Sequence, residues 1–325
     1  MASRLPVHRA RRGHSGRVSE PVTAAPASAR PPGTVLAHAE AAYLGLALGD
    51  ALGATVEFMT PREIVHHYGV HREIVGGGWL RLKPGQITDD TGMSLALGEA
   101  ILAKGGNVVP LACAEAFDAW MRSKPIDIGN TVRRNLIRFR NSGNPVAEYS
   151  DHDAGNGAAM RVLPVALVTL GRSEAQVRAA CRAQARVTHH NALSDAACEF
   201  LVLTVQDFIT GASLGQVFRQ RISPLVQQHP EFAFDERPRR ENPSGWIVET
   251  VQAVLQALVE LDGFEHCLVD VVNRGGDADT TGAIAGMLAG ALYGREALPA
   301  RWLQALDPDI HERCRAQARA LAVPD

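Results

Sequence analysis

The sequence predicts an all-α fold for this chain of 325 residues. From Thr34 onward, segments rich in Ala and Leu place apolar residues three and four positions apart, which is the spacing of one helix face. Clusters of Gly, Pro and Asn separate these segments, as expected for connections between helices. Runs of β-branched residues that alternate with polar residues are nearly absent, so a sheet would leave most segments unexplained.

The helical spacing recurs along the whole chain and stops at each breaker cluster. We expect helices over residues 35–48, 91–103, 110–122, 131–140, 159–170, 173–185, 193–210, 244–260, 264–273 and 280–292. Helices 91–103 and 280–292 are rich in Ala and Gly, which lets helix axes approach closely, so we place both in the centre of a bundle. The polar stretch 222–243 is expected to be one long loop. No internal repeat and no Pro/Gly linker follows residue 33, so residues 34–325 are predicted to form a single domain.

Composition and charge exclude several classes of protein. Hydrophobic residues make up 46% and charged residues 21%, as in folded globular proteins. The formal charge of −2 gives no global positive field, so no nucleic-acid partner is expected. The five Cys are scattered singly without a CxxC pair, which favours a reducing cytoplasm over a disulfide framework. The longest small and apolar stretch, 280–294, is shorter than the ~20 residues that a bilayer requires, so no membrane span is predicted.

The first 33 residues differ from the rest of the chain. They contain six Arg against one acid, Glu20, and their Pro, Ala and Ser content cannot bury much surface. We therefore predict that residues 1–33 form a disordered basic tail. A solvated, dispensable extension is the favoured interpretation, and an arm that binds an acidic partner is the alternative.

Two acidic turns stand directly before apolar helical segments. The first, in ITDDT, contains Thr88, Asp89 and Asp90, and the second, in GGDADT, contains Asp277, Asp279 and Thr280. Carboxylates one or two positions apart, with a neighbouring hydroxyl, supply several hard oxygen ligands that suit Mg²⁺, Mn²⁺ or Ca²⁺. If the two helix starts converge, the turns could form a dinuclear centre with the metals ~4 Å apart.

Each turn has a structural alternative. Asp and Thr are favoured N-caps, and acids in a first turn suit the helix dipole. One N-cap needs only one such side chain, however, and four carboxylates at the starts of central helices repel one another unless cations neutralise them. The two turns together therefore favour a metal site over capping alone.

Together with three further motifs, these turns resemble the ADP-ribosylglycohydrolase family. The matching segments are GDALGATVEF at 49–58, ITDDT at 87–91, GNGAAMR at 155–161, VTHH at 187–190 and GGDADTTGAIAG at 275–286. The resemblance covers essentially all of residues 34–325. Within the family the chain is most similar to the members that reactivate dinitrogenase reductase, through IDIGN at 126–130, VTHHNALSDAA at 187–197 and PSGWIVETVQAVL at 243–255.

The resemblance implies a compact all-α domain whose central cleft holds two divalent cations, Mn²⁺ or Mg²⁺. Carried over by motif, the metal ligands are Thr88, Asp89, Asp90, Asp277, Asp279 and Thr280. The implied reaction is hydrolysis of the bond between the anomeric carbon of ADP-ribose and a protein side chain, which is an arginine in the members that act on dinitrogenase reductase. The expected partners are this ADP-ribosylated protein and a nitrogen-signalling regulatory protein.

The resemblance also implies acid, base and ligand-binding residues. Cleavage at an anomeric carbon needs a base that activates water and an acid that assists the leaving group. Our catalytic candidates are Asp127, Glu57 and Asp90. The substrate-binding candidates lie in the same motifs and are Asn130, Gly155, Asn156, Gly157, Ala158, Met160, His190, Trp246 and Gly276. The 155–158 segment could cradle the diphosphate or be a plain flexible turn, His190 could bind the ligand or be structural, and Trp246 could stack on adenine or belong to the core.

Two alternative functions remain at this point. One is a glycohydrolase of other linkage or target, such as a toxin-modified protein or serine-linked ADP-ribose. The other is an ADP-ribose-binding regulator without turnover. All six motif ligands are present in this sequence, which favours an enzyme.

Overall fold

The protein is built from helices, as predicted. The computed structural model describes residues 30–235 and 237–322, so most of the predicted tail, residues 1–29, lies outside the described residues. The α-helices are α1 (Pro32–Gly53), α2 (Pro61–Tyr68), α3 (Asp89–Ala103), α4 (Pro110–Arg122), α5 (Asn130–Ser142), α6 (Leu163–Val168), α7 (Glu174–Ala185), α8 (Ala192–Thr210), α9 (Leu214–Val217), α10 (Ser223–Gln228), α11 (Ile247–Glu260), α12 (Phe264–Val272), α13 (Ala278–Tyr293), α14 (Ala300–Ala305) and α15 (Pro308–Ala322). Within the described ranges, the only β-pairings outside helices are two isolated bridges.

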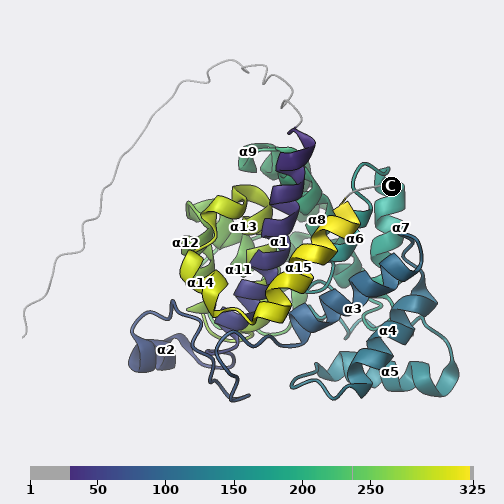
Figure 1. Cartoon of the computed structure of the whole chain (residues 1–325), viewed down its shortest axis with the longest axis horizontal. Helices are drawn as coiled ribbons and strands as arrows, with labels where there is room; N and C mark the ends of the chain where they lie inside the picture. Colours follow the sequence, from purple (N-terminus) through teal and green to yellow (C-terminus); the bar gives the residue numbers. More distant parts are fainter. Residues whose placement is uncertain (1–29, 236, 323–325) are drawn as a thin grey trace, which may run out of the picture.

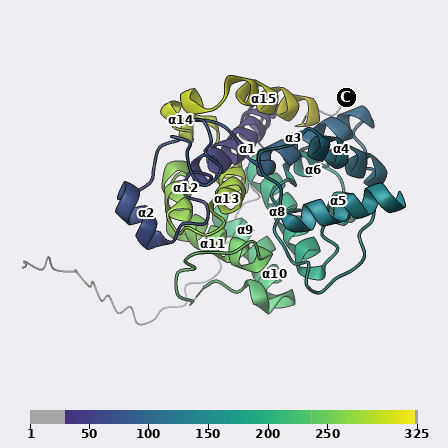
Figure 2. The ribbon, with the colours of Figure 1, turned by 90° about the horizontal axis from the view of Figure 1, so that it is seen from below.

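Helices α1 and α13 form the centre of the bundle. They lie side by side, with α12 and α15 against them (Figures 1 and 2). Glycines allow this contact, because a Cβ atom on Gly49 would stand 2.0 Å from the carbonyl oxygen of Gly282, and one on Gly45 would stand 2.2 Å from that of Gly286. The central position predicted for 280–292 is confirmed, but its main partner is α1, whereas α3 packs chiefly on α4.

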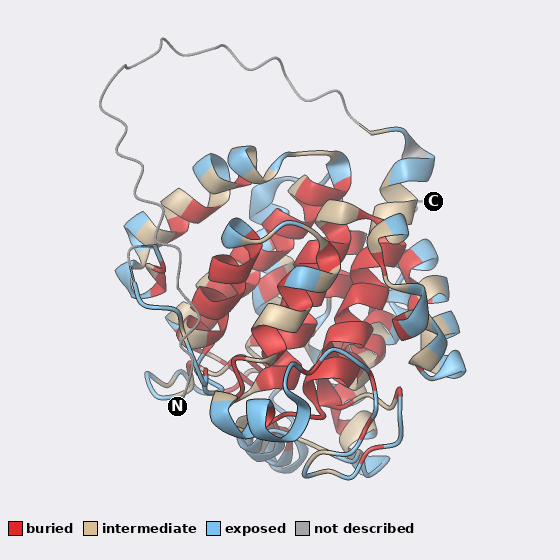
Figure 3. Cartoon of the chain, turned by 90° about the vertical axis from the view of Figure 1, so that its left-hand side faces the viewer, coloured by how far each residue is buried: buried red, intermediate tan, exposed pale blue. Residues whose placement is uncertain are grey.

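The burial pattern follows from this arrangement. The inner helices are buried around most of their circumference, and the outer helices expose one face (Figure 3). In the described part of the chain, α1 is the one helix long and apolar enough to cross a membrane. Of its most apolar 18-residue stretch, within 33–53, 78% is buried inside the protein. A helix that is apolar all round and covered on all sides is a core helix.

Three differences separate the predicted helices from those observed. The expected helix 159–170 is shorter, because α6 spans Leu163–Val168 only. The expected loop 222–243 instead contains α10 and a 3-10 turn, and it buries Phe232 and Phe234 in the core. Helices α2, α9, α14 and α15 were not predicted from the sequence. Helix α15 is easily missed because its sequence is rich in charge, but it buries one narrow face that includes Cys314 and Leu321.

Candidate active site

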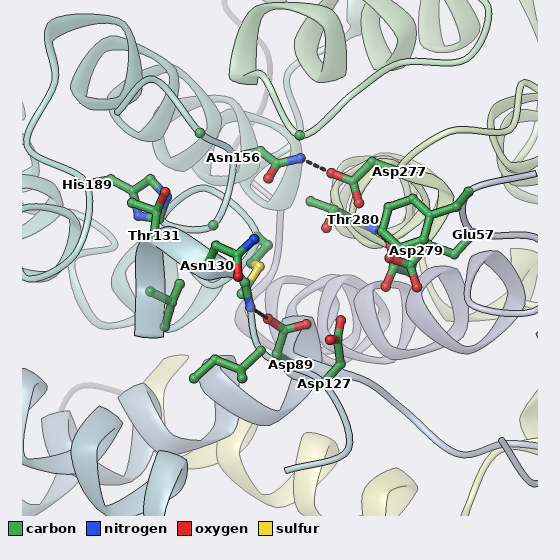
Figure 4. Close-up of a pocket in the computed structure, with 18 of the residues that line it drawn as sticks. Glu57, Asp89, Asp127, Asn130, Thr131, Asn156, His189, Asp277, Asp279 and Thr280 are labelled. Atoms are coloured by element: carbon green, nitrogen blue, oxygen red, sulfur yellow. Dashed lines mark hydrogen bonds between the residues drawn. The ribbon is translucent and has the colours of Figure 1, made fainter. Parts of the chain in front are cut away.

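A cleft of about 480 Å³ lies at the ends of several helices. It is lined by the turn after α1, the first turns of α3 and α13, the loop between α4 and α5, and the 155–157 turn (Figure 4). The lining residues are Glu57, Phe58, Trp79, Asp89, Asp127, Ile128, Gly129, Asn130, Thr131, Val132, Gly155, Asn156, Gly157, Met160, His189, Gly245, Asp277, Asp279 and Thr280.

The two acidic turns predicted from the sequence converge at the base of this cleft. Carboxylate oxygens of Asp89, Asp90 and Asp279 lie within 4.8 Å of one another, and so do those of Glu57, Asp127 and Asp279. The two groups share Asp279, so they are contiguous. Carboxylate oxygens gathered in this way could hold a hard divalent cation.

The hydrogen bonds in the cluster also fit a cation. The buried Oδ1 atom of Asp90 has no hydrogen-bond partner. The hydroxyl of Thr88 lies 3.0 Å from Asp50 Oδ1, 3.1 Å from Asp90 Oδ2 and 3.3 Å from Asp279 Oδ2, and it can donate its proton to one of these acceptors only. Buried acceptors left without donors are costly, so this cluster has the character of a metal-ligand set.

Electrostatics give the same indication. Burial raises the pKa of Glu57 to about 8, and burial with the nearby charge of Asp127 raises the pKa of Asp89 to about 7. Burial and neighbouring carboxylates hold the pKa values of Asp90 and Asp279 well above the usual range. The cleft therefore cannot keep all its carboxyl groups ionised at neutral pH unless a positive charge enters it.

A buried carboxylate from α1, Asp50, holds the first acidic turn. Its side chain accepts hydrogen bonds from the backbone N–H and the hydroxyl of Thr88, both at 3.0 Å, and from the backbone N–H and hydroxyl of Thr91, at 3.1 and 2.6 Å. Burial raises the pKa of Asp50 to about 6. Because α1 also packs along α13, Asp50 connects the turn before α3 to the helix pair that carries the second turn.

Glycine conformations place Glu57 beside the second turn. Gly275 and Gly276 have φ values of +72° and +67°, which favour glycine over residues with side chains. A Cβ atom on Gly276 would also stand 2.1 Å from the carbonyl oxygen of Pro243. The Gly276 carbonyl accepts a 2.7 Å hydrogen bond from the N–H of Phe58, which fixes the neighbouring Glu57 near Asp277.

The 155–157 turn meets the acidic cluster through one side chain. Asn156 Nδ2 donates to Asp277 Oδ2 at 2.6 Å and to the Thr250 hydroxyl at 3.0 Å (Figure 4). On the other side of the turn, the ring of His189 occupies the space that a Cβ atom on Gly155 or Gly157 would need. The turn therefore spans the distance between the carboxylates and His189.

Most predicted site residues line the cleft, but six do not. Thr88 and Asp90 are buried beneath it within the acidic cluster, Ala158 is fully buried, and Gly276 contributes its backbone to the adjoining turn. His190 points elsewhere, with Nδ1 2.8 Å from the Ala147 carbonyl and its ring edge-on to Tyr149. Trp246 is 42% exposed and is not part of the lining.

The fold also brings to the cleft residues that were not predicted from the sequence, among them Phe58, Trp79, Thr131 and His189. Asp50 was not predicted either; it does not line the cleft but holds the first acidic turn. Asp50 and Phe58 lie inside the GDALGATVEF motif and His189 inside VTHH, so their motifs were found although their roles were not. Trp79 comes from a loop without any motif, and its Nε1 donates a 2.6 Å hydrogen bond to Glu57 Oε2.

Comparisons with known proteins agree with this geometry. The ADP-ribosylglycohydrolase family model matches residues 31–324. The chain is 52% identical to the ADP-ribosyl-[dinitrogen reductase] glycohydrolase of Rhodospirillum rubrum, over 86% of this chain and 94% of that protein. It is 34% identical to the ADP-ribosylarginine hydrolase Tri1 of Serratia proteamaculans, over 83% and 75%. A solved structure, titled an ADP-ribosylglycohydrolase-related protein complex, superposes with a TM-score of 0.79 and 35% identity, over 89% of this chain and 98% of that one. The chain is therefore a member of the ADP-ribosylglycohydrolase family, an enzyme family of hydrolases.

Proposed function

We propose that this enzyme removes ADP-ribose from an arginine side chain of modified dinitrogenase reductase and so restores nitrogenase activity. The observation that carries the proposal is the convergence of Asp89, Asp90 and Asp279 with Glu57 and Asp127 in one cleft. The target is supported by the relative from Rhodospirillum rubrum, whose name states dinitrogen reductase. The arginine linkage is supported by the Tri1 relative, which is named for ADP-ribosylarginine.

We further propose that two divalent cations, Mn²⁺ or Mg²⁺, complete the site. Their ligands would be Thr88, Asp89 and Asp90 from one turn and Asp277, Asp279 and Thr280 from the other. When bound, such ions orient the ribose hydroxyls and stabilise charge at the reacting centre. The unpartnered Asp90 oxygen and the mutual repulsion of the buried carboxyl groups support this assignment.

Side chains of the cleft supply the proton transfers. Asp127 takes a proton from the attacking water while the oxygen of that water bonds to the anomeric carbon. The bond to the guanidino nitrogen breaks with its electron pair staying on that nitrogen. Glu57, whose raised pKa keeps its proton near neutral pH, gives that proton to the departing neutral guanidine. Asp90 would contribute to the reaction as a metal ligand rather than as a proton donor or acceptor.

The remaining lining residues position the sugar nucleotide. The turn of Gly155, Asn156 and Gly157, followed by Ala158, would face the diphosphate, and this role is supported by the ring of His189, which lies against the turn. Asn130 at the start of α5 and Met160 border the same space. Arginine suits this cleft because the ribosylated guanidinium is cationic when bound, whereas a neutral serine oxygen needs stronger acid assistance to depart.

The cellular setting is also part of the proposal. A cytoplasmic location is supported by the five cysteines, which are all free and buried. Modified dinitrogenase reductase is the proposed protein substrate, and a nitrogen-signalling regulatory protein remains a predicted second partner. Another protein with an ADP-ribosylated arginine is the alternative substrate, because the Tri1 relative carries no mention of dinitrogenase reductase in its name.

The test is a comparison of initial rates on three substrates with the Mn²⁺-loaded full chain. The substrates are ADP-ribosylated dinitrogenase reductase, another arginine-ADP-ribosylated protein and a serine-ADP-ribosylated protein. We expect fast release from both arginine-linked substrates, fastest from the reductase, and slow release from serine. Faster release from the serine-linked protein than from the arginine-linked proteins would refute the arginine linkage. Release from the other arginine-linked protein without release from the reductase would refute the target.

A further inference from the structure

The ring of His189 is held at the wall of the cleft with one edge toward the 155–157 turn. A Cβ atom on Gly155 would stand 2.9 Å from its Nε2 atom, and one on Gly157 would stand 2.8 Å from Cε1. The N–H groups of Gly157 and Ala158 donate to no protein acceptor among the described residues. Donors gathered at one turn suit an anionic group, so the orientation of the His189 ring nitrogens matters for ligand binding.

A buried cation lies behind this histidine. Arg161 is fully buried, and its guanidinium donates from Nε to Gln184 Oε1 at 2.9 Å and from Nη2 to the Thr188 hydroxyl at 2.7 Å. The guanidinium also stacks 4.1 Å above the centre of the Phe117 ring. No carboxylate within the described ranges forms an ion pair with it. Its position is therefore set by neutral partners. One of them, Thr188, also contacts His189, which lines the cleft.

The direction of the hydrogen bonds follows from the chemistry of the three groups. A guanidinium donates only, so the Thr188 oxygen must accept from Arg161. Among the described residues, the one acceptor within reach of the buried Thr188 hydroxyl proton is His189 Nδ1, which lies 2.9 Å away, and a buried donor left without an acceptor is costly. Nδ1 is therefore the acceptor, and a neutral ring must carry its proton on Nε2, the nitrogen that faces the turn. Burial and the charge of Arg161 lower the pKa of His189 to about 3, so the ring is neutral at physiological pH.

We infer that Arg161 and Thr188 are positioning residues that fix His189 as the Nε2–H tautomer, and so make it a hydrogen-bond donor to the diphosphate of ADP-ribose. The identity of this ligand rests on the proposed function. The tautomer itself rests only on contacts within the protein. Neither Arg161 nor Thr188 lines the cleft, so both act through the histidine.

Two variants of Thr188 separate this role from simple packing. Thr188→Val keeps the shape of the side chain but can neither donate to Nδ1 nor accept from Arg161, whereas Thr188→Ser keeps both hydrogen bonds. The readouts are the imidazole ¹⁵N shifts of His189 in the Mn²⁺-free and ADP-ribose-free full chain, and calorimetric affinity for ADP-ribose in the Mn²⁺-loaded chain. A His189→Gln variant assigns the NMR signals.

We expect a protonated Nε2 and an unprotonated Nδ1 in the wild type and in Thr188→Ser. Thr188→Val should give a mixture of tautomers, and because only the Nε2–H fraction can donate to the ligand, ADP-ribose should bind roughly two- to fivefold more weakly. A wild-type ring protonated on Nδ1 would overturn the inference whether or not the variants fold. Wild-type shifts and affinity in Thr188→Val would overturn it as well. If the wild type binds no ADP-ribose, the proposed function fails, while the NMR result still decides the tautomer.

Discussion

Asp50 Oδ1 accepts hydrogen bonds from both the backbone N–H and the hydroxyl of Thr88, each at 3.0 Å. This pair joins α1, the central helix, to the turn that supplies half of the proposed metal ligands. Outer groups that orient ligands contribute to metal affinity although they never touch the ion. Asp50 is therefore expected to raise the affinity of the site for its metal ions by holding Thr88 in place.

Replacing Asp50 by Asn tests this role. The variant keeps the shape of the side chain, but its amide N–H₂ would face the N–H and hydroxyl donors of Thr88 and Thr91. We expect affinity for Mn²⁺, measured by calorimetry, to fall by roughly 10- to 100-fold. Asp118→Asn is the control, because Asp118 pairs with Arg140 away from the cleft. Affinity equal to that of the wild type would show that Asp50 does not position the turn.

The pH dependence of stability without metal follows from the raised pKa values. The pKa values of Asp50, Asp89 and Glu57 lie at about 6, 7 and 8 in the folded protein, against ~4 in an unfolded chain. Between pH 5 and pH 8 the folded state therefore binds more protons than the unfolded state. The free energy of unfolding must then fall as the pH rises through this window.

Thermal melts of the chelated protein at pH 5, 6, 7 and 8 check this sign. Tm should decrease steadily across the series. Asp90→Asn, which removes one of the mutually repelling groups, should melt higher than the wild type at pH 8. Saturating Mn²⁺ should abolish the decrease, because cations bind the ionised carboxylates. A metal-free Tm that rises from pH 5 to pH 8 would contradict the electrostatic description of the cleft.

Trp79 offers a test of the acid role of Glu57. Its 2.6 Å hydrogen bond to Glu57 Oε2 favours the carboxylate and so opposes the effect of burial on the pKa of Glu57. In Trp79→Phe the pKa of Glu57 should rise, and the fall of kcat/KM at high pH should move to higher pH. Trp120→Phe, in α4 and outside the cleft, should leave the profile unchanged. A shift to lower pH would exclude Glu57 as the proton donor.

The contact between α1 and α13 predicts the effect of one methyl group. In Gly49→Ala the new Cβ would overlap the Gly282 carbonyl oxygen, and backbone cannot turn aside as a flexible side chain would. We expect a loss of about 3 kcal/mol in the free energy of unfolding, measured with urea. Gly215→Ala is the matched control, since its nearest neighbour is the end of the Arg219 side chain at 3.7 Å. Equal stability of both variants would contradict the close packing.

The sequence predicted the acidic cluster better than its surroundings. The paired turns could be found because carboxylates and a hydroxyl on consecutive residues have few structural uses, and the structure brings Asp89 and Asp90 of one turn to Asp279 of the other. Asp50 gave no such signal, because a lone Asp inside an apolar helix has many uses. The sequence offered His190 as a ligand-facing residue, but the backbone turn before α8 directs its neighbour His189 to the cleft instead. The side chains of adjacent residues point in different directions, and a sequence motif alone does not determine which of the two enters the cleft.

The fold was predictable to a similar degree. Apolar helices such as α4 were located to the residue, because Pro110 and the polar Ser123 bound the segment. Helix α15 was missed because its buried face is narrow and most of its other residues are charged or polar. The prediction of one long loop over 222–243 was wrong because contacts with a distant helix order this segment. Gln252 and Gln256 of α11 donate to its backbone carbonyls and help to hold Phe232 and Phe234 in the core.

The most direct test of the central claim is the release of free ADP-ribose from arginine-ADP-ribosylated dinitrogenase reductase, followed by mass spectrometry. The full chain is assayed as purified, after exhaustive chelation, and after chelation followed by Mn²⁺. We predict release in the first and third samples, almost none in the second, and recovery of reductase with an intact, unmodified arginine. Undiminished release after chelation, or no release in the presence of Mn²⁺, would contradict the account of the cleft as a cation-dependent ADP-ribosylarginine hydrolase.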